Sequence, residues 1–496
     1  MDLVQGLIAR THHHTLRERM QSRVAARYSC RTWRARGHRR ALVAFLLTVL
    51  ALALLTLSPE VVVPAVLMLA FATMAVATVT KSAASLAHLL HRPPPAAPPL
   101  TEAQLPTISI LVPLYRERRI AEVLVRRLQA ITYPREKLDI LLVLEEEDHL
   151  TQQVLRATDL PPWIRTLTVP DGQPRTKPRA MNYALDHCTG EIIGVYDAED
   201  APAPDQLLRV ANAFAESPPD VVCLQGVLDY YNPRTNWISR CFTIEYNTWF
   251  RLLLPGMARL GLALPLGGTT LFFRRDPLED LGGWDAHNVT EDADLGFRLA
   301  RAGYRTRALD TTTEEEANDR PIPWIRQRSR WLKGYMVTYL VHMRDPHRLW
   351  NDLGTWQFLG FQAHFLTAMA QFALGPLLWL FWLATLGIDL PFTTLDTSRM
   401  MQALSLIFIA QELLTMALGA IAVQRAGHRR LWLWVPVLHL YWPLGTIAMW
   451  KALYELIVQP FYWDKTDHGH SLPDYEATVP IVPESIFSRV TKAREI

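Results

Sequence analysis

An acidic turn with the sequence Asp-Ala-Glu-Asp, residues 197–200, has the residue types and spacing of a metal site. It follows the apolar residues 190–196, which have the composition of a buried strand, and ligands bind at the carboxyl ends of strands in open parallel sheets. Carboxylate oxygens suit a hard divalent cation that neutralises a diphosphate leaving group. The sequence therefore predicts that Mg²⁺ or Mn²⁺ is held there by Asp197, Glu199 and Asp200.

A second acidic group, residues 145–148, follows the strand-like residues 140–144. Because parallel strands end at one edge of a sheet, we expect the two acidic groups to lie close together. Either group alone could be an ordinary acidic turn, since short acidic motifs are common. Their convergence favours a nucleotide site. We also assign to this site the residues at the end of the strand-like run 108–113. The donor-side residues expected here are Pro113, Tyr115, Glu117, Glu145 and Glu147.

Cationic and glycine-rich segments are expected at the same edge of the sheet. Lys177 and Arg179 open a helix-like segment, and a helix amino terminus with cationic side chains suits phosphate. The alternative for both residues is a solvated helix face. Gly-Gly-Thr-Thr at residues 267–270 precedes the strand-like residues 271–274. Glycine there permits close approach of the backbone to a ligand, although a simple bend fits equally well.

The sequence Thr290-Glu291-Asp292 begins a helix that we expect to run to Arg301. Thr290 is a plausible helix cap, and one acidic residue in the first turn suits the helix dipole. Capping does not require two consecutive carboxylates. Asp292 is therefore the candidate general base, with Glu291 beside it in the predicted catalytic pair.

The elements that must position these residues alternate along the chain. Helix-like segments separate strand-like runs at residues 108–113, 140–144, 192–196 and 221–225. This alternation predicts an α/β domain with a mainly parallel sheet. Residues 321–342 are rich in Trp, Arg and Tyr, which is typical of an amphipathic helix in a membrane interface.

The chain also has the composition of a membrane protein. It has 496 residues, 50% of them hydrophobic, with 16 Trp and a net charge of +3. Residues 41–57 and 61–80 predict a helical hairpin, and long apolar runs recur at residues 355–388, 401–423 and 431–458. Ten Arg precede residue 41 against two acidic residues, which favours a solvated cytoplasmic arm over one that binds nucleic acid.

The number of spans after the α/β domain stays open. Gly375-Pro376 lies inside residues 355–388, which fits an interfacial helix with one span or two short spans. Pro443-Leu444-Gly445 predicts a break or a re-entrant turn within residues 431–458. The four Cys show no metal-ligand spacing, and we expect no disulfides.

These motifs resemble the processive family 2 glycosyltransferases: the cellulose, chitin, hyaluronan and related bacterial exopolysaccharide synthases. The resemblance rests on the order of the acidic strand end, Thr-Glu-Asp and Gln-x-x-Arg-Trp at residues 327–331, framed by apolar helices. It implies a GT-A-type domain inserted between transmembrane helices, with amphipathic interface helices. It further implies an inverting hexosyltransferase that moves sugar from a UDP donor, favouring UDP-glucose, onto a growing β-linked chain that leaves through its own channel.

The resemblance also implies roles for individual residues. Asp197 and Glu199 match the family's metal-binding Asp-x-Asp pair, but Glu stands second and Asp200 follows it, so these two carboxylates compete for one role. Asp292 matches the base. The implied contacts to the donor diphosphate are Lys177, Asp197, Gln327, Arg328 and Arg330. The implied acceptor side consists of Trp331, Gly268, Thr269 and Glu245.

A segment near the carboxyl end is similar to the gating segments of these synthases. Trp463, Lys465, Thr466 and His468 are implied to close over bound UDP. A juxtamembrane anchor is the alternative, since aromatic residues and Lys are common at membrane interfaces.

The expected organisation places the catalytic domain in the cytosol beneath a bacterial inner membrane. The predicted parts are a basic arm (1–40), two transmembrane helices (41–82), a Pro-rich linker (83–106), the GT-A domain (107–320), interfacial helices (321–354), channel helices (355–458) and a tail (459–496). The expected partners are a UDP-sugar, a polysaccharide acceptor and lipid, without nucleic acid; self-association or export partners stay open. Two alternatives are single sugar addition to a membrane lipid and a silent scaffold in an export complex.

Overall fold

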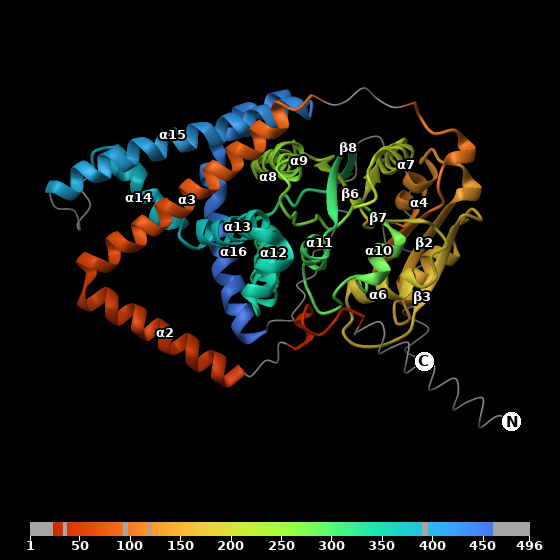
Figure 1. The fold of residues 1–496 in the computed structure, drawn as a ribbon, viewed down its shortest axis with the longest axis horizontal. Coiled ribbons are helices and arrows are strands. Elements are labelled where there is room, and N and C mark those ends of the chain that lie inside the picture. Colours follow the sequence, from red (N-terminus) through yellow and green to blue (C-terminus); the bar gives the residue numbers. More distant parts are fainter. Residues whose placement is uncertain (1–22, 33–36, 93–97, 118–120, 389–394, 460–496) are drawn as a thin grey trace, which may run out of the picture.

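The computed structural model describes residues 23–32, 37–92, 98–117, 121–388 and 395–459. The α/β domain occupies one side of the molecule and the long apolar helices the other (Figure 1). The predicted gating residues lie outside the described part of the chain; they are Trp463, Lys465, Thr466 and His468.

One eight-stranded sheet forms the centre of the α/β domain, with the order β3-β2-β1-β4-β7-β6-β8-β5. The first four strands of that order are parallel, and β6 and β8 are also parallel, while β7 runs against both of its neighbours. The predicted α/β domain with a mainly parallel sheet is therefore confirmed. The strands are β1 (Ile108–Leu114), β2 (Leu138–Glu145), β3 (Ile164–Val169), β4 (Ile192–Val195), β5 (Ala201–Pro202), β6 (Val221–Tyr230), β7 (Leu271–Arg274) and β8 (Arg305–Glu315).

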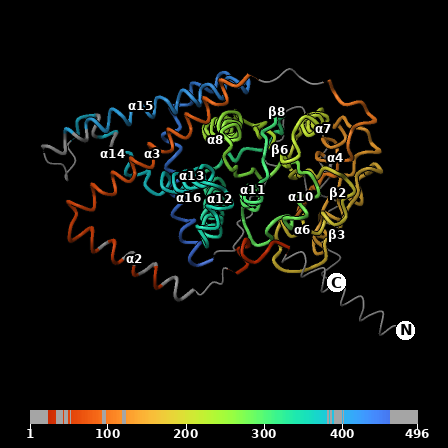
Figure 2. Tube along the Cα trace, in the orientation of Figure 1, coloured from red at the N-terminus to blue at the C-terminus, as the bar shows by residue number. Residues whose placement is uncertain are grey.

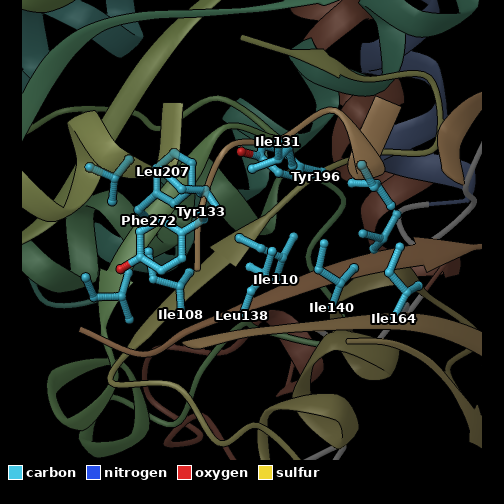
Figure 3. Packing of buried hydrophobic residues seen from close by; sticks show 14 of the residues in the cluster. Ile108, Ile110, Ile131, Tyr133, Leu138, Ile140, Ile164, Tyr196, Leu207 and Phe272 are labelled. Carbon is cyan, nitrogen blue, oxygen red and sulfur yellow. The ribbon is translucent and has the colours of Figure 1, made fainter. Parts of the chain in front are cut away.

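Both faces of the sheet are covered because the central strands are apolar on both sides. One face packs against α4 (Ala121–Gln129), α5 (His149–Arg156) and α7 (Gln206–Glu216). Figure 3 shows this core, in which Ile108, Ile110 and Ile140 lie near Tyr196 and Phe272. The other face packs against α6 (Lys177–Leu185), α10 (Arg275–Asp280) and α11 (Glu291–Arg301). The two layers of helices fix the strand ends that carry the acidic residues.

Three strands were not predicted from the sequence: the two-residue β5, and the longer β3 and β8. In β3 the buried and exposed positions alternate over much of its length, and β8 contains several charged residues and is largely unburied. Neither has the continuous apolar run that marks a central strand. Each gains its backbone hydrogen bonds from a neighbour that is apolar, β2 and β6 respectively.

Long helices form the second part of the molecule, and α3 runs beside α13 and α15 (Figures 1 and 2). Among the described residues, three helices are long and apolar enough to cross a membrane: Pro59–Leu89, Gln402–Arg425 and Arg429–Val458. The two helices predicted over residues 41–57 and 61–80 are α2 and α3, which meet at Ser58 and diverge from there (Figure 1). The bounds are α2 (Gly37–Leu57), α3 (Pro59–Leu89), α13 (Pro346–Ala373), α14 (Gly375–Thr385), α15 (Leu395–Arg425), η5 (Arg429–Val437) and α16 (Leu438–Val458).

The interruption predicted at Pro443 is wrong. The helix α16 continues through Pro443 and Gly445, and the irregular stretch is the 3₁₀ segment η5 before it. Gly445 serves packing instead, because a Cβ atom there would lie 2.2 Å from Phe372. The predicted interruption at Gly375-Pro376 is found, since it separates α13 from α14.

Three further segments connect the two parts of the molecule. The helix predicted over residues 321–342 is α12 (Pro321–His342), and α8 (Trp237–Thr248) continues through η4 (Trp249–Leu253) into α9 (Leu254–Arg259). The basic arm is not wholly solvated as expected, because its residues 23–32 pack on the domain. Arg23 pairs with Asp186 at 2.8 Å, and the Ser29 hydroxyl donates to Asp285 at 2.8 Å. Buried Cys30 and the other Cys are all free.

Candidate functional site

A cavity of about 1210 Å³ lies at the carboxyl ends of β1, β2 and β4 and extends between the apolar helices. Pro113 and Asp197 lie at its sheet end, and Asp292 and Trp331 line its middle. Its far end is lined by aromatic and polar residues of α13, α14, α15 and α16. The cavity therefore connects the predicted donor side with the membrane helices.

The acidic turn after β4 faces a single lysine. Asp197 and Lys177 form an ion pair, and the Lys177 ammonium also donates to the Gly268 carbonyl at 2.9 Å. Burial lowers the pKa of Lys177, but attraction by Asp197 and Glu291 prevails and the pKa lies above its ordinary value. Lys177 thus joins the acidic turn, the glycine segment and the start of α6. We expected these three segments to lie at the same edge of the sheet, but the ion pair between Lys177 and Asp197 was not predicted.

The third acid of the turn faces inward. Asp200 is fully buried and accepts hydrogen bonds from the Asp197 amide at 2.8 Å and from the Thr269 hydroxyl. Burial, together with the charges of Asp197 and Glu199, raises the pKa of Asp200 well above its ordinary value. Asp200 therefore closes the turn against the 267–270 segment, whereas Glu199 lines the cavity.

Two carboxylates of the acidic turn, those of Asp197 and Glu199, are of the type that binds a hard cation. Among the described residues, no group of three or more His, Cys, Asp or Glu side chains is arranged to hold a metal ion. Mg²⁺ takes one or two protein carboxylates and completes its shell with water and substrate phosphates. Asp197 and Glu199 both line the cavity, so they are the carboxylates of the acidic turn that are available to such an ion.

The residues after β1 and β2 also meet at this edge. Tyr115 donates to Glu147 at 3.4 Å, and Glu147 pairs with Arg175 at 2.7 Å. Cavity-lining residues from these strands are Pro113, Tyr115, Glu117 and Glu145. The expected convergence of the two acidic groups is therefore present in the structure.

Arg179 does not face a phosphate site. Its side chain is buried, pairs with Glu145 at 3.2 Å and donates to the Pro170 carbonyl at 2.6 Å. Neither the phosphate role nor the solvated face that we considered for Arg179 is correct. Its position two residues after the start of α6 turns it toward β2 instead of the cavity.

The predicted catalytic pair begins α11 and borders the middle of the cavity. Burial raises the pKa of Asp292 to about 6, and burial with the charge of Asp292 raises the pKa of Glu291 to about 8. Asp292 accepts from the Ala293 amide at 2.8 Å. Asp292 lines the cavity beside Gly268, where a Cβ atom would lie 3.4 Å from the other Asp292 oxygen.

Thr290 occupies the cap position of α11 without a side-chain capping bond. The predicted cap position is therefore confirmed, but the hydroxyl contributes no capping hydrogen bond. The side chain packs on α12 instead, where a Cβ atom at Gly334 would lie 2.3 Å from the Thr290 methyl group. The absence of a side chain at Gly334 lets α12 approach the start of α11.

The Gln-x-x-Arg-Trp helix faces the same cavity. Arg328 pairs with Glu245 at 2.7 Å, and its guanidinium lies 4.8 Å from the centre of the Trp331 ring. Glu245 also accepts from the Tyr441 hydroxyl at 2.7 Å. Arg328 and Glu245 both line the cavity, and their ion pair forms the wall against which Trp331 lies.

The other two residues of this motif differ in their surroundings. Gln327 accepts from the Asn318 amide at 2.9 Å. Arg330 lines the cavity, where burial lowers its pKa and the charges of Glu291 and Asp292 oppose that shift. Arg330 thus joins the acidic groups of the site.

Sequence reasoning missed Glu315, which ends β8 and lines the cavity beside the acidic turn. Burial and the charges of Asp200 and Glu199 raise its pKa well above its ordinary value. The available signal was the Glu-Glu-Glu run at residues 314–316, which follows β-branched Thr residues as a strand end would.

An acidic edge of a mainly parallel α/β sheet, facing a paired carboxylate and an aromatic helix, is the arrangement of a GT-A-type glycosyltransferase domain. Residues 106–334 match the family described as "Glycosyltransferase like family 2". These residues therefore form a family 2 glycosyltransferase domain, as predicted. The match ends within α12, so it does not include the helices α13 to α16.

Curated relatives are similar over the same region. "Probable glycosyltransferase YdaM" of Bacillus subtilis is 25% identical over 250 residues, 50% of this chain and 59% of that protein. "Beta-monoglucosyldiacylglycerol synthase" of Trichormus variabilis is 27% identical over 270 residues, 52% and 56% of the two chains. "Cellulose synthase 1 catalytic subunit [UDP-forming]" of Komagataeibacter xylinus is 26% identical over 289 residues, 57% and 37% of the two chains. The matches thus span about half the length of the first relatives.

Proposed function

We propose that this protein is an inverting, membrane-embedded hexosyltransferase that extends a β-linked polysaccharide from a UDP-sugar, with UDP-glucose as the first candidate. The observation that carries the proposal is the continuous cavity from Asp197 past Asp292 and Trp331 to α14 and α16. A soluble acceptor would need no passage between apolar helices. The catalytic domain would face the cytosol of a bacterial cell, where nucleotide sugars are made.

The donor binds at the sheet edge in this proposal. The nucleoside lies near Pro113 and Tyr115, and Lys177 and Arg330 attract the diphosphate. A divalent cation on Asp197 and Glu199 would neutralise charge on the departing UDP. Asp200 does not take this role because its carboxylate is engaged with Asp197 and Thr269. The burial of Asp200 and the position of Glu199 on the cavity support Glu199 as the second metal ligand.

The acceptor sugar lies against Trp331, whose ring suits the apolar face of a pyranose. Asp292 takes the proton from the attacking hydroxyl as the new bond forms at the anomeric carbon and the bond to UDP breaks. Attack opposite to the leaving group inverts the centre, so an α-linked donor gives a β-linked product. Lys177 and Arg330 provide fixed positive charge for the leaving diphosphate.

A membrane lipid is the second candidate acceptor. It is favoured by the similarity to the glucosyldiacylglycerol synthase and by the position of the far cavity between α3, α13, α14 and α15, where a lipid headgroup could enter. A silent scaffold is the least supported alternative, because Asp197, Asp292 and Trp331 all line one cavity.

The test is a screen of nucleotide sugars with the full chain in lipid vesicles, with the Asp292→Asn variant as the inactive control. Radiolabel that resists organic extraction and is released by a β-glycosidase indicates polymer. Radiolabel that extracts into organic solvent with a single sugar indicates the lipid acceptor. The absence of UDP-sugar turnover by the wild-type protein with every donor would refute both proposals.

A further inference from the structure

A buried acid next to the catalytic pair has no part in the mechanism above. Asp294 lies two residues after Asp292 on α11, and its side chain is completely buried. One of its oxygens accepts from Arg298 at 2.7 Å, and the other lies 3.1 Å from His342 Nε2 on α12. The His342 side chain is also completely buried.

The partners of His342 define which ring nitrogen carries the proton. Its Nδ1 lies 3.1 Å from an Arg301 guanidinium nitrogen. Because a guanidinium has only donors, Nδ1 must accept, and the proton of the neutral ring is on Nε2. Burial lowers the pKa of His342, which keeps the ring neutral. His342 therefore donates to Asp294 and accepts from Arg301 at the same time.

This contact is part of a balanced buried network. Arg301 donates to Asp352 on α13 at 2.7 Å and lies 4.8 Å from the ring centre of Tyr28 in the amino-terminal segment. The negative charges of Asp294 and Asp352 balance the positive charges of Arg298 and Arg301 around the neutral ring of His342. Removal of one partner from such a buried set leaves an uncompensated group and is strongly unfavourable. The network thus joins α11, α12, α13 and residues 23–32, which lie together in Figure 2.

Two contacts fix α12 against α11. The first is Gly334 against Thr290, and the second is His342 against Asp294. They are eight residues apart on α12, or about 12 Å at 1.5 Å per residue. One contact alone would let α12 pivot, whereas two separated contacts fix its direction.

We infer that Asp294 and His342 are positioning residues that hold the base Asp292 in register with Trp331 and Arg330. The inference rests on the proposed function. Transfer requires the acceptor hydroxyl and the base to meet within a fraction of an ångström, and a misplacement of about 1 Å costs about a hundredfold in rate. Most of the proposed donor contacts lie at the sheet edge, which the network does not touch, and Arg330 is the donor contact that α12 carries.

The test compares His342→Gln with His342→Leu in the full chain in vesicles. A glutamine amide is neutral and offers both a donor and an acceptor, whereas leucine offers neither. We expect His342→Leu to lower kcat about a hundredfold and to raise donor KM by a smaller factor through Arg330, and His342→Gln to recover most of the loss in kcat. The fraction of donor lost to hydrolysis by water should rise in the leucine variant, which a loss of stability alone would not cause.

The outcomes separate the inference from the proposed function. If the wild-type protein turns over no nucleotide sugar, the proposed function fails. If it is active and the leucine variant keeps its kcat and its ratio of transfer to hydrolysis, the positioning role fails. If the leucine variant does not fold, as judged by UDP binding, Asp294→Asn takes its place, because a neutral amide is a weaker acceptor for His342 than a carboxylate and loses the charge that pairs with Arg298. Unchanged kcat in that variant would equally overturn the inference.

Discussion

Replacement of Asp292 by Asn tests the centre of the proposed mechanism with the smallest change of shape. The Asn side-chain oxygen can still accept from the Ala293 amide, which Asp292 does at 2.8 Å. The second oxygen, which lies beside Gly268, is replaced by an amide group that cannot take a proton. The fold and the donor site should therefore persist while the base is lost.

The expected loss of activity follows from the contribution that a positioned general base makes to the rate. General base catalysis contributes about 100- to 10,000-fold, so kcat should fall by that factor, or by about 3 to 5 kcal/mol in activation free energy. The affinity for UDP, measured by calorimetry on the detergent-solubilised protein, should stay near that of the wild type. Asp292→Glu is the matched control, because it keeps a carboxylate and should retain more activity than the Asn variant.

The pH profile gives an independent measure of the same group. Burial raises the pKa of Asp292 to about 6, and only the deprotonated form accepts a proton. The wild-type kcat should therefore rise with pH up to about 6 and then level off. An Asn variant with wild-type kcat, or one that loses UDP binding as severely as turnover, would refute the assignment of Asp292 as base.

Three further variants and one treatment address the surrounding structure. Gly334→Ala places a Cβ atom 2.3 Å from Thr290, so thermal unfolding should show a loss of about 1 to 3 kcal/mol, and a second change, Thr290→Ala, should restore part of it. Lys177→Met removes a charged hydrogen bond worth about 1.5 to 3 kcal/mol, and kinetics should show a higher donor KM as its main effect; an unchanged KM would exclude Lys177 from donor binding. Glu199→Gln should weaken Mn²⁺ binding, followed by paramagnetic resonance, more than the matched change in Asp200 does; the reverse order would assign the metal to Asp200. A chelator should abolish turnover and added Mg²⁺ should restore it, whereas full activity in the chelator would contradict a metal requirement.

The local patterns of the sequence were sufficient to predict the strands and the helix that carry the site. The apolar run before Asp197 is β4, the strand expected after Gly-Gly-Thr-Thr is β7, and the helix expected after Thr290 is α11. These predictions succeed because buried central strands and amphipathic helices have a periodicity that does not depend on their neighbours. Charged strands such as β8 have no such signal, since they form only when paired with an apolar neighbour.

By itself the sequence determined the class of chemistry: two acidic strand ends, a carboxylate pair and an Arg-Trp helix beside apolar runs. Only the tertiary structure decided which carboxylate faces the cavity. Glu199 and Asp200 are adjacent and similar in type, but Asp200 is turned inward by the Asp197 amide and the Thr269 hydroxyl. Similarly, Arg179 is indistinguishable from Lys177 as a cation in the sequence, yet it pairs inside the fold with Glu145. Side-chain direction depends on contacts between distant segments, and for that reason local sequence does not encode it.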